Sequence, residues 1–215
     1  MNIEDRLRAL AARATSPDAD TETDDVRADV LDAVRRVLPA RFQHAWEGDR
    51  ELPDRAARWA LDSRRPYALV LSGPAGTGKT WVAWHAAQTA VETLSERPRG
   101  QWLRFVNAVN LEDFGHDQCP FLVIDDLGQE HIGARCKYRS VLYRIVNTRW
   151  EHSLPTVITT NLGGSVPPTW AEGSEHATIL DRYGSAVWDR LSERVTLRTT
   201  GASYRTRVDT PNNRW

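Results

Sequence analysis

The stretch that decides the fold of this 215-residue chain is Gly73-Pro74-Ala75-Gly76-Thr77-Gly78-Lys79-Thr80. It matches the pattern G-x-x-x-x-G-K-[ST], in which glycines let backbone N–H groups converge on phosphate oxygens. The apolar run YALVLS at residues 67–72 predicts a strand, and residues 81–94 carry the apolar face of a helix. Because the motif requires a strand before it and a helix after it, this context indicates a phosphate-binding loop.

The residue types in the loop indicate how it would bind a nucleoside triphosphate. Backbone N–H groups and the positive N-terminal end of the next helix attract phosphate oxygens. Lys79, one of two lysines in the chain, would neutralise the β- and γ-phosphates. Thr80 would ligate Mg²⁺, which needs only one or two protein oxygens. We therefore predict that nucleotide is bound by nine residues: Gly73, Pro74, Ala75, Gly76, Thr77, Gly78, Lys79, Thr80 and Trp81.

A pair of carboxylates follows a second apolar run. The stretch Phe121–Asp126 reads FLVIDD, the pattern of a buried strand that delivers acids at its carboxyl end. Ligands of open α/β sheets bind at that edge. We predict that Asp125 holds Mg²⁺ through water and that Asp126 orients or deprotonates the attacking water. Glu130, four residues further on, is a rival for the role of base.

A third β-branched run, Thr156–Thr160, ends at Asn161. This amide would position the nucleophilic water or contact the γ-phosphate. In isolation, an Asn before Gly163-Gly164 is equally typical of a residue that caps a loop.

Strands and helices alternate along the main part of the chain. Apolar runs at residues 102–106, 121–124 and 156–160 predict strands, and Arg135–Trp150 has a helical stripe. This alternation is typical of an α/β protein with a parallel sheet covered on both faces. We also expect one helix over Asp181–Glu193 and a last strand after it.

Composition excludes several classes of protein. The chain is 40% hydrophobic and 27% charged, which is inconsistent with global disorder. Its apolar runs are far shorter than the ~18–20 residues that span a bilayer, and residues 1–14 do not resemble a signal peptide. The two cysteines have no metal-site spacing. We expect a cytoplasmic protein with no membrane association.

The motifs together resemble the AAA+ ATPase superfamily, and within it the DnaC-type helicase loaders and the IstB-like transposition ATPases. The resemblance is carried by GPAGTGKT, FLVIDDLGQE, PTVITTNL, YGSAVWDRLSER and GASYRTR, in the family's order over residues 41–207. It implies a P-loop NTPase fold with a five-stranded parallel sheet flanked by helices. It also implies that the Asn161 strand lies between the phosphate-loop strand and the Asp125 strand.

The resemblance also implies roles for further residues. Arg190 matches the arginine finger that reaches ATP bound by a neighbouring subunit, so the chain is expected to form a homo-oligomer. Arg182 and Arg194 lie on much the same helical face and are alternatives. Residues 41–42 precede the core where the family encloses adenine, and Ser203-Tyr204-Arg205 matches a terminal motif for which residue chemistry suggests no mechanism.

Residues 1–38 form an extension to the ATPase core at 39–215. Ile3–Arg13 and Val26–Leu38 have the apolar spacing of two short amphipathic helices. The stretch 15–25, TSPDADTETDD, has five acids and no base, which predicts a flexible linker. The paired helices would dock on a partner or pack on each other.

The leading functional hypothesis is an ATP- and Mg²⁺-dependent ATPase that loads or remodels a replicative DNA helicase on single-stranded DNA during replication. Contact with DNA is in question, because only 14 residues separate Val106 from Phe121, where loaders of this family have longer DNA-gripping helices. An IstB-like transposition helper is an alternative. Another is an ATP-gated adaptor with little hydrolysis, since Asp126 stands where many AAA+ proteins have Glu.

Overall fold

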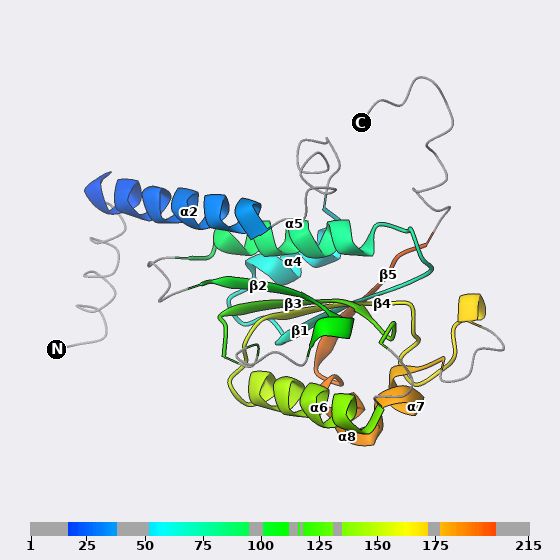
Figure 1. The fold of residues 1–215 in the computed structure, drawn as a ribbon. Helices are drawn as coiled ribbons and strands as arrows, with labels where there is room; N and C mark the ends of the chain where they lie inside the picture. The colour runs from blue at the N-terminus through cyan, green and yellow to red at the C-terminus, as the bar shows by residue number, and fades with distance from the viewer. Residues whose placement is uncertain are drawn as a thin grey trace, which may run out of the picture.

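The computed structural model describes residues 17–37, 52–94, 101–111, 116, 118–130, 135–171 and 177–200. Five strands form one parallel sheet in the order β2-β3-β4-β1-β5 (Figure 1). Their bounds are β1 Ala68–Ser72, β2 Leu103–Asn107, β3 Phe121–Leu127, β4 Thr156–Thr160 and β5 Arg194–Arg198. The predicted five-stranded sheet is confirmed, with the strand that precedes Asn161 between those of the phosphate loop and Asp125.

The register brings the carboxyl ends of the central strands together. Ser72 at the end of β1 pairs with Thr160 at the end of β4. Along β3 and β4 the pairing shifts between Ile124 and Leu127, so that Asp125 and Asp126 both lie opposite Thr159. Two residues opposite one is a β-bulge, a device that re-aims side chains at the edge of a site.

Helices cover both faces of the sheet (Figure 1). One face carries α5 (Lys79–Val91), α4 (Asp54–Leu61) and α2 (Pro17–Val37). The other carries α6 (Arg135–Glu151), α7 (Ile179–Tyr183) and α8 (Ser185–Arg190). The short helices η2 (Ala108–Asn110) and η4 (Thr169–Ala171) follow β2 and β4.

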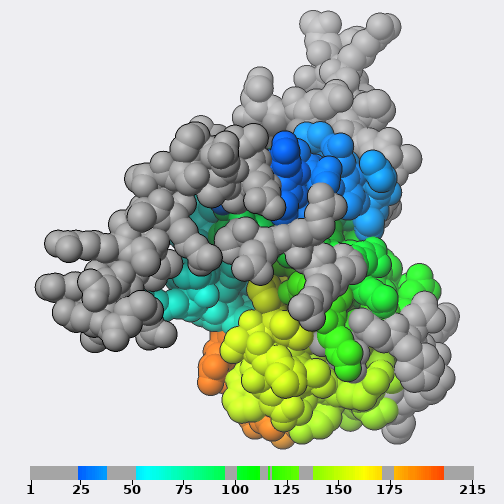
Figure 2. Space-filling model, turned by 90° about the vertical axis from the view of Figure 1, so that its left-hand side faces the viewer, coloured from blue at the N-terminus to red at the C-terminus, as the bar shows by residue number. Residues whose placement is uncertain are grey.

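In strand β1, the four apolar residues at 68–71 are divided between the two faces of the sheet. Leu69 and Leu71 pack into the core beside α5, whereas Ala68 and Val70 pack into the core beside α6. Successive side chains of a strand point to opposite faces, so a strand buried on both faces contains an apolar run rather than an alternation of apolar and polar residues. In the space-filling view, α2 (blue) lies in the upper part of the face shown and α6 (yellow-green) in the lower part (Figure 2).

The acidic stretch 15–25 is not a linker from Pro17 onward, because it forms the first half of α2. Proline is tolerated at the start of a helix, where its missing N–H breaks no hydrogen bond, and acids are favoured near the positive N-terminal end. Composition suggested a flexible linker, but the position of these residues at a helix N-terminus and the packing of the second half of α2 outweigh it.

That second half belongs to the core. Val30 and Val34, 6% and 1% exposed, pack in the cluster around α5, and the Arg27 Nε–H donates to the Leu94 carbonyl at 3.1 Å. The expected helix over Ile3–Arg13 lies outside the described residues, as do residues 41–42 and 203–205.

The single helix expected over Asp181–Glu193 is two short helices. Gly184 separates α7 from α8 with φ 90° and ψ 170°, a conformation that favours glycine. Of the helices in the described ranges, none is both long and apolar enough to cross a bilayer.

Truncation of Val34 to alanine tests the packing of α2. The change removes buried methyl groups and should lower the free energy of unfolding by about 1–3 kcal/mol in urea titration. Arg36→Ala, at an exposed position of the same helix, should change it by less than about 0.5 kcal/mol. Equal stability of the two variants would show that α2 does not pack on the core.

Candidate functional site

The phosphate loop lies between β1 and α5, where the sequence predicts it. Gly76 and Gly78 have φ of 82° and 87°, in the left-handed region that side chains disfavour. Gly78 caps α5, so the N-terminal end of the helix, at Lys79, directly follows the loop. Such a helix end is a ready site for anions.

The end of β5 supports this loop from behind. The Thr199 N–H donates to the Ser72 carbonyl at 2.8 Å, and the hydroxyls of Thr199 and Thr77 are 2.6 Å apart. A Cβ on Gly73 would lie 2.3 Å from the Thr199 carbonyl oxygen. Gly73 is therefore required for close approach of two backbones. The motif alone gives no hint of Thr199, which is 122 residues from Thr77.

Lys79 lies folded within the loop. Its Nζ donates to the carbonyls of Gly73 and Pro74 at 2.9 and 2.7 Å, and the residue is 6% exposed. The ammonium group is thus held at the concave side of the loop, close to where phosphate oxygens would meet its N–H groups.

Asp125 and Thr80 meet at the same edge of the sheet. The Thr80 hydroxyl donates to the Asp125 Oδ1 at 2.9 Å, and the carboxylate is almost fully buried, at 1% exposed. A hydroxyl beside a carboxylate is a hard-oxygen donor pair of the kind Mg²⁺ prefers. The residues therefore fit the expected ion. The described residues hold no group of three or more His, Cys, Asp or Glu that would form an all-protein metal cage.

Thr159 fixes both acids of the bulge. Its hydroxyl donates to Asp125 Oδ1 at 2.7 Å and accepts from the Asp126 N–H at 2.9 Å. Asp126 is half-buried and has a φ of 58°, an uncommon conformation for a residue with a side chain. Strain of this kind persists where surrounding contacts impose it, often at functional sites. Sequence reasoning missed Thr159, although its position in β4 opposite the two acids would have suggested it.

Asn161 follows β4 directly, beside the loop, since the Gly73 N–H donates to the Thr160 carbonyl at 3.2 Å. The Trp170 indole N–H donates to the Asn161 carbonyl at 2.9 Å. The side-chain Oδ1 of Asn161 is buried and has no hydrogen-bond partner among the described residues. A buried polar atom without a partner is costly, so it points to a donor that a ligand or water would supply.

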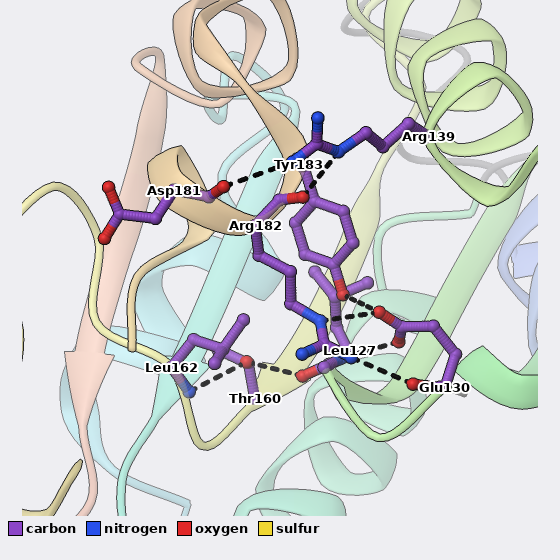
Figure 3. A network of polar contacts seen from close by, with 9 residues as sticks. Leu127, Glu130, Arg139, Thr160, Leu162, Asp181, Arg182 and Tyr183 are labelled. Carbon is purple, nitrogen blue, oxygen red and sulfur yellow. Dashed lines mark hydrogen bonds and ion pairs between the residues drawn. The ribbon is translucent and has the colours of Figure 1, made fainter. Parts of the chain in front are cut away.

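Glu130 is fully engaged by its own chain (Figure 3). Its Oε1 accepts from Arg182 Nε at 2.7 Å and from the Tyr183 hydroxyl at 2.6 Å, and its Oε2 accepts from the Gly128 N–H at 3.0 Å. Burial raises the pKa of the Glu130 carboxyl, but the hydrogen bonds from Tyr183 and Arg182 outweigh burial and hold the pKa below its usual value. Both oxygens are used, which leaves Asp126 as the better candidate for the base.

The three candidate arginines have different surroundings. Arg182 is buried against Glu130, and Arg194 lies 4.0 Å over the Trp188 ring and donates to Thr196. Arg190, at the end of α8, is half-buried. Its Nε donates to the Asn147 amide oxygen at 2.9 Å, and its guanidinium lies 4.7 Å over the ring of Trp150. Both partners of the Arg190 side chain lie on α6.

Trp81, predicted to bind nucleotide, lies in the first turn of α5. It is half-buried against the core, and its ring centroid is 4.0 Å from that of His85. Trp81 therefore lies close to the loop, on the helix that follows it.

Solved structures of two replication proteins have a fold similar to that of this chain. The chain is similar to the DnaC helicase loader, with a TM-score of 0.53 and 21% identity over 75% of this chain and 100% of that chain. It is also similar to domain III of the Thermotoga maritima replication initiation protein DnaA, with a TM-score of 0.50 and 13% identity over 81% and 69% of the two chains. No family model and no curated protein matches the sequence. The chain has the fold of these two replication proteins, an α/β fold with a five-stranded parallel sheet flanked by helices, as predicted.

The depressed pKa of the Glu130 carboxyl predicts that the stability of the folded protein depends on pH. A carboxyl whose pKa is depressed by folding stabilises the protein above its unfolded pKa, near 4.5, and the effect is lost as pH falls through the folded value. Wild type should therefore exceed Glu130→Gln in free energy of unfolding by more at pH 7 than at pH 3.5, measured in urea. Glu151→Gln, at an exposed site, is the control. A difference independent of pH would contradict the ion pair.

Proposed function

We propose that this chain is an Mg²⁺-dependent ATPase that assembles with copies of itself and acts as a helicase loader in DNA replication. The observation that carries the enzymatic part is the contact of Thr80 with the buried Asp125 at the edge where the phosphate loop ends. A P-loop fold supplies the phosphate site, and this hydroxyl–carboxylate pair supplies the oxygens that a divalent cation needs.

Each residue of the site has a role in this proposal. The N–H groups of residues 75–80 bind the phosphates, and Lys79 moves from the loop carbonyls to phosphate oxygens when these arrive. Thr80 and Asp125 hold Mg²⁺, which neutralises charge on the phosphates when bound. Asp126 orients the attacking water and accepts its proton, and the unpartnered amide oxygen of Asn161 holds that water in line.

Arg190 is proposed to act on the nucleotide of a neighbouring subunit. Phosphoryl transfer spreads negative charge over the equatorial oxygens, and an arginine supplied in trans contributes ~10³–10⁵ in rate. Of the three candidates, Arg182 is committed to Glu130 within its own subunit. Arg190 is half-buried at the end of a helix, with its guanidinium oriented by Asn147 and Trp150.

Three observations support the loader role. The sequence carries the YGSAVWDRLSER stretch typical of DnaC-type proteins. The fold is similar to that of the DnaC helicase loader over the whole of that chain. The DnaA domain with the same fold comes from a replication initiation protein. We infer that the partner is a replicative helicase, with single-stranded DNA as a second ligand. Docking would use the part of residues 1–38 that lies outside the α2 face packed on the core.

Two measurements separate this role from its alternatives. Co-purification with a hexameric helicase would favour the loader over an IstB-like transposition helper. The shorter carboxylate of Asp126, in place of Glu, favours the ATP-gated adaptor as the second candidate. Absence of ATP-dependent phosphate release, with helicase and DNA both present, would favour the adaptor.

Lys79→Ala tests the phosphate site. Loss of a charge-assisted contact to phosphate should weaken ATP binding by about 30- to 100-fold, measured with a fluorescent ATP analogue. The matched control is Lys137→Ala, which removes the other lysine of the chain and should leave affinity unchanged. Unchanged ATP affinity in Lys79→Ala would contradict the assignment of residues 73–80 as a phosphate-binding loop.

Arg190→Ala tests the arginine in trans. ATP affinity should stay within about twofold of wild type, while turnover falls by at least ~10²-fold, measured by phosphate release at saturating ATP. Arg58→Ala, on the exposed side of α4, is the control. Normal turnover in Arg190→Ala would move the role to Arg194.

A further inference from the structure

Glu130 joins two parts of the molecule that have separate roles in the proposed reaction (Figure 3). On one side is the turn at the end of β3, which begins at Asp126. On the other side is α7, which leads through Gly184 into α8 and Arg190. The first part acts on the nucleotide of its own subunit, and the second acts on that of the neighbour.

Several hydrogen bonds hold the turn. The Gln129 N–H donates to the Asp126 carbonyl at 3.1 Å, and the Gly128 N–H donates to Glu130 Oε2 at 3.0 Å. Gly128 has a φ of 104°, and a Cβ there would lie 3.0 Å from two atoms of the Leu162 side chain. The carboxylate of Glu130 thus closes the turn that begins at the strained Asp126.

The helix side of the cluster is held as firmly. Arg182 contacts Glu130 twice, through Nε to the side-chain Oε1 at 2.7 Å and through Nη2 to the main-chain carbonyl at 2.9 Å. The Tyr183 hydroxyl donates to the same Oε1 at 2.6 Å. From α6, Arg139 donates to the carbonyls of Arg182 and Asp181 at 2.7 and 3.2 Å. These contacts fix the end of α7 immediately before the Gly184 break.

We propose that Glu130 is a positioning residue that, through Arg182 and Tyr183, sets the place of α7 and α8 relative to the turn of Asp126. One carboxylate then aligns the base of a subunit with the arginine that the same subunit offers to its neighbour. A shift of the turn when nucleotide binds would move α7 and, beyond Gly184, Arg190. This inference rests on the proposed function of Arg190 in trans.

Stability alone is a weak reason for such a cluster. Replacing a buried ion pair with apolar residues of similar volume is often neutral or stabilising, so burial of Glu130 and Arg182 is not explained by folding free energy. Alignment of two elements is a role that apolar packing fulfils less well, because charged hydrogen bonds fix distance and direction.

Mixed assemblies test the proposal. Subunits with Lys79→Ala bind ATP much more weakly but still offer Arg190, so in excess, at an ATP concentration that occupies only wild-type sites, they act as donors to wild-type subunits. Turnover per wild-type subunit then reports the placement of Arg190 in the donor. Donors that also carry Glu130→Gln should support about fivefold less turnover, and those with Tyr183→Phe about threefold less, than donors with Lys79→Ala alone.

Tyr138 offers a matched control. Its ring centroid lies 6.1 Å from that of Tyr183, and its buried hydroxyl has no hydrogen-bond partner among the described residues. Donors with Lys79→Ala and Tyr138→Phe should support turnover equal to that of the parent donor. Thermal melting and gel filtration of every donor verify that it folds and assembles. Should Glu130→Gln not fold, Tyr183→Phe, which keeps its ring, decides the question.

The outcomes separate this inference from the function on which it rests. If folded Glu130→Gln and Tyr183→Phe donors support turnover as well as the parent donor, the coupling is wrong, while the arginine in trans stands. If donors with Lys79→Ala and Arg190→Ala support full turnover, Arg190 does not act on the neighbour, and the proposed role of α8 fails with the coupling.

Discussion

The rest of the site depends on the bulge in β3 and on the Thr159 hydroxyl that holds it. This hydroxyl donates to the Asp125 carboxylate and accepts from the N–H of Asp126, so a single side chain satisfies two neighbouring residues. Asp125 faces Thr80 on α5 because strand alternation puts it on the same side as Phe121 and Val123, and the bulge coincides with the left-handed conformation of Asp126. Without it, successive acids on a strand would point to opposite faces of the sheet.

The parallel pairing of the strands brings the groups of the site to one edge of the sheet. The carboxyl ends of β1, β3 and β4 meet at one edge, and each delivers a different polar element there: the loop, the acids and Asn161. The groups come from three distant segments, but the ladders of backbone hydrogen bonds fix their spacing. Ligands of open α/β sheets bind at this edge for the same reason.

Much of this was predictable from the sequence, because local patterns encode it. The glycines and the lysine of the loop have a fixed spacing, and an apolar strand followed by acids has a fixed direction. The place of β4 between β1 and β3 came from resemblance to known proteins, not from periodicity.

Features that depend on tertiary contact were not predictable. The acids at 15–25 suggested a linker, yet Val30 and Val34 anchor the same helix to α5. From the sequence, Glu130 is a candidate base because it lies four residues after Asp126. Its partner Arg182 is 52 residues further along the chain, so the sequence does not reveal their contact. Local composition has no information about partners so distant in sequence.

The most direct measurement is a structure of the assembled protein with Mg²⁺ and a non-hydrolysable ATP analogue. We expect the β- and γ-phosphates within residues 73–80, the metal beside Thr80 and Asp125, and Arg190 of a second copy at the γ-phosphate. An empty loop, or an Asp125 carboxylate directed away from the phosphates, would contradict this expectation.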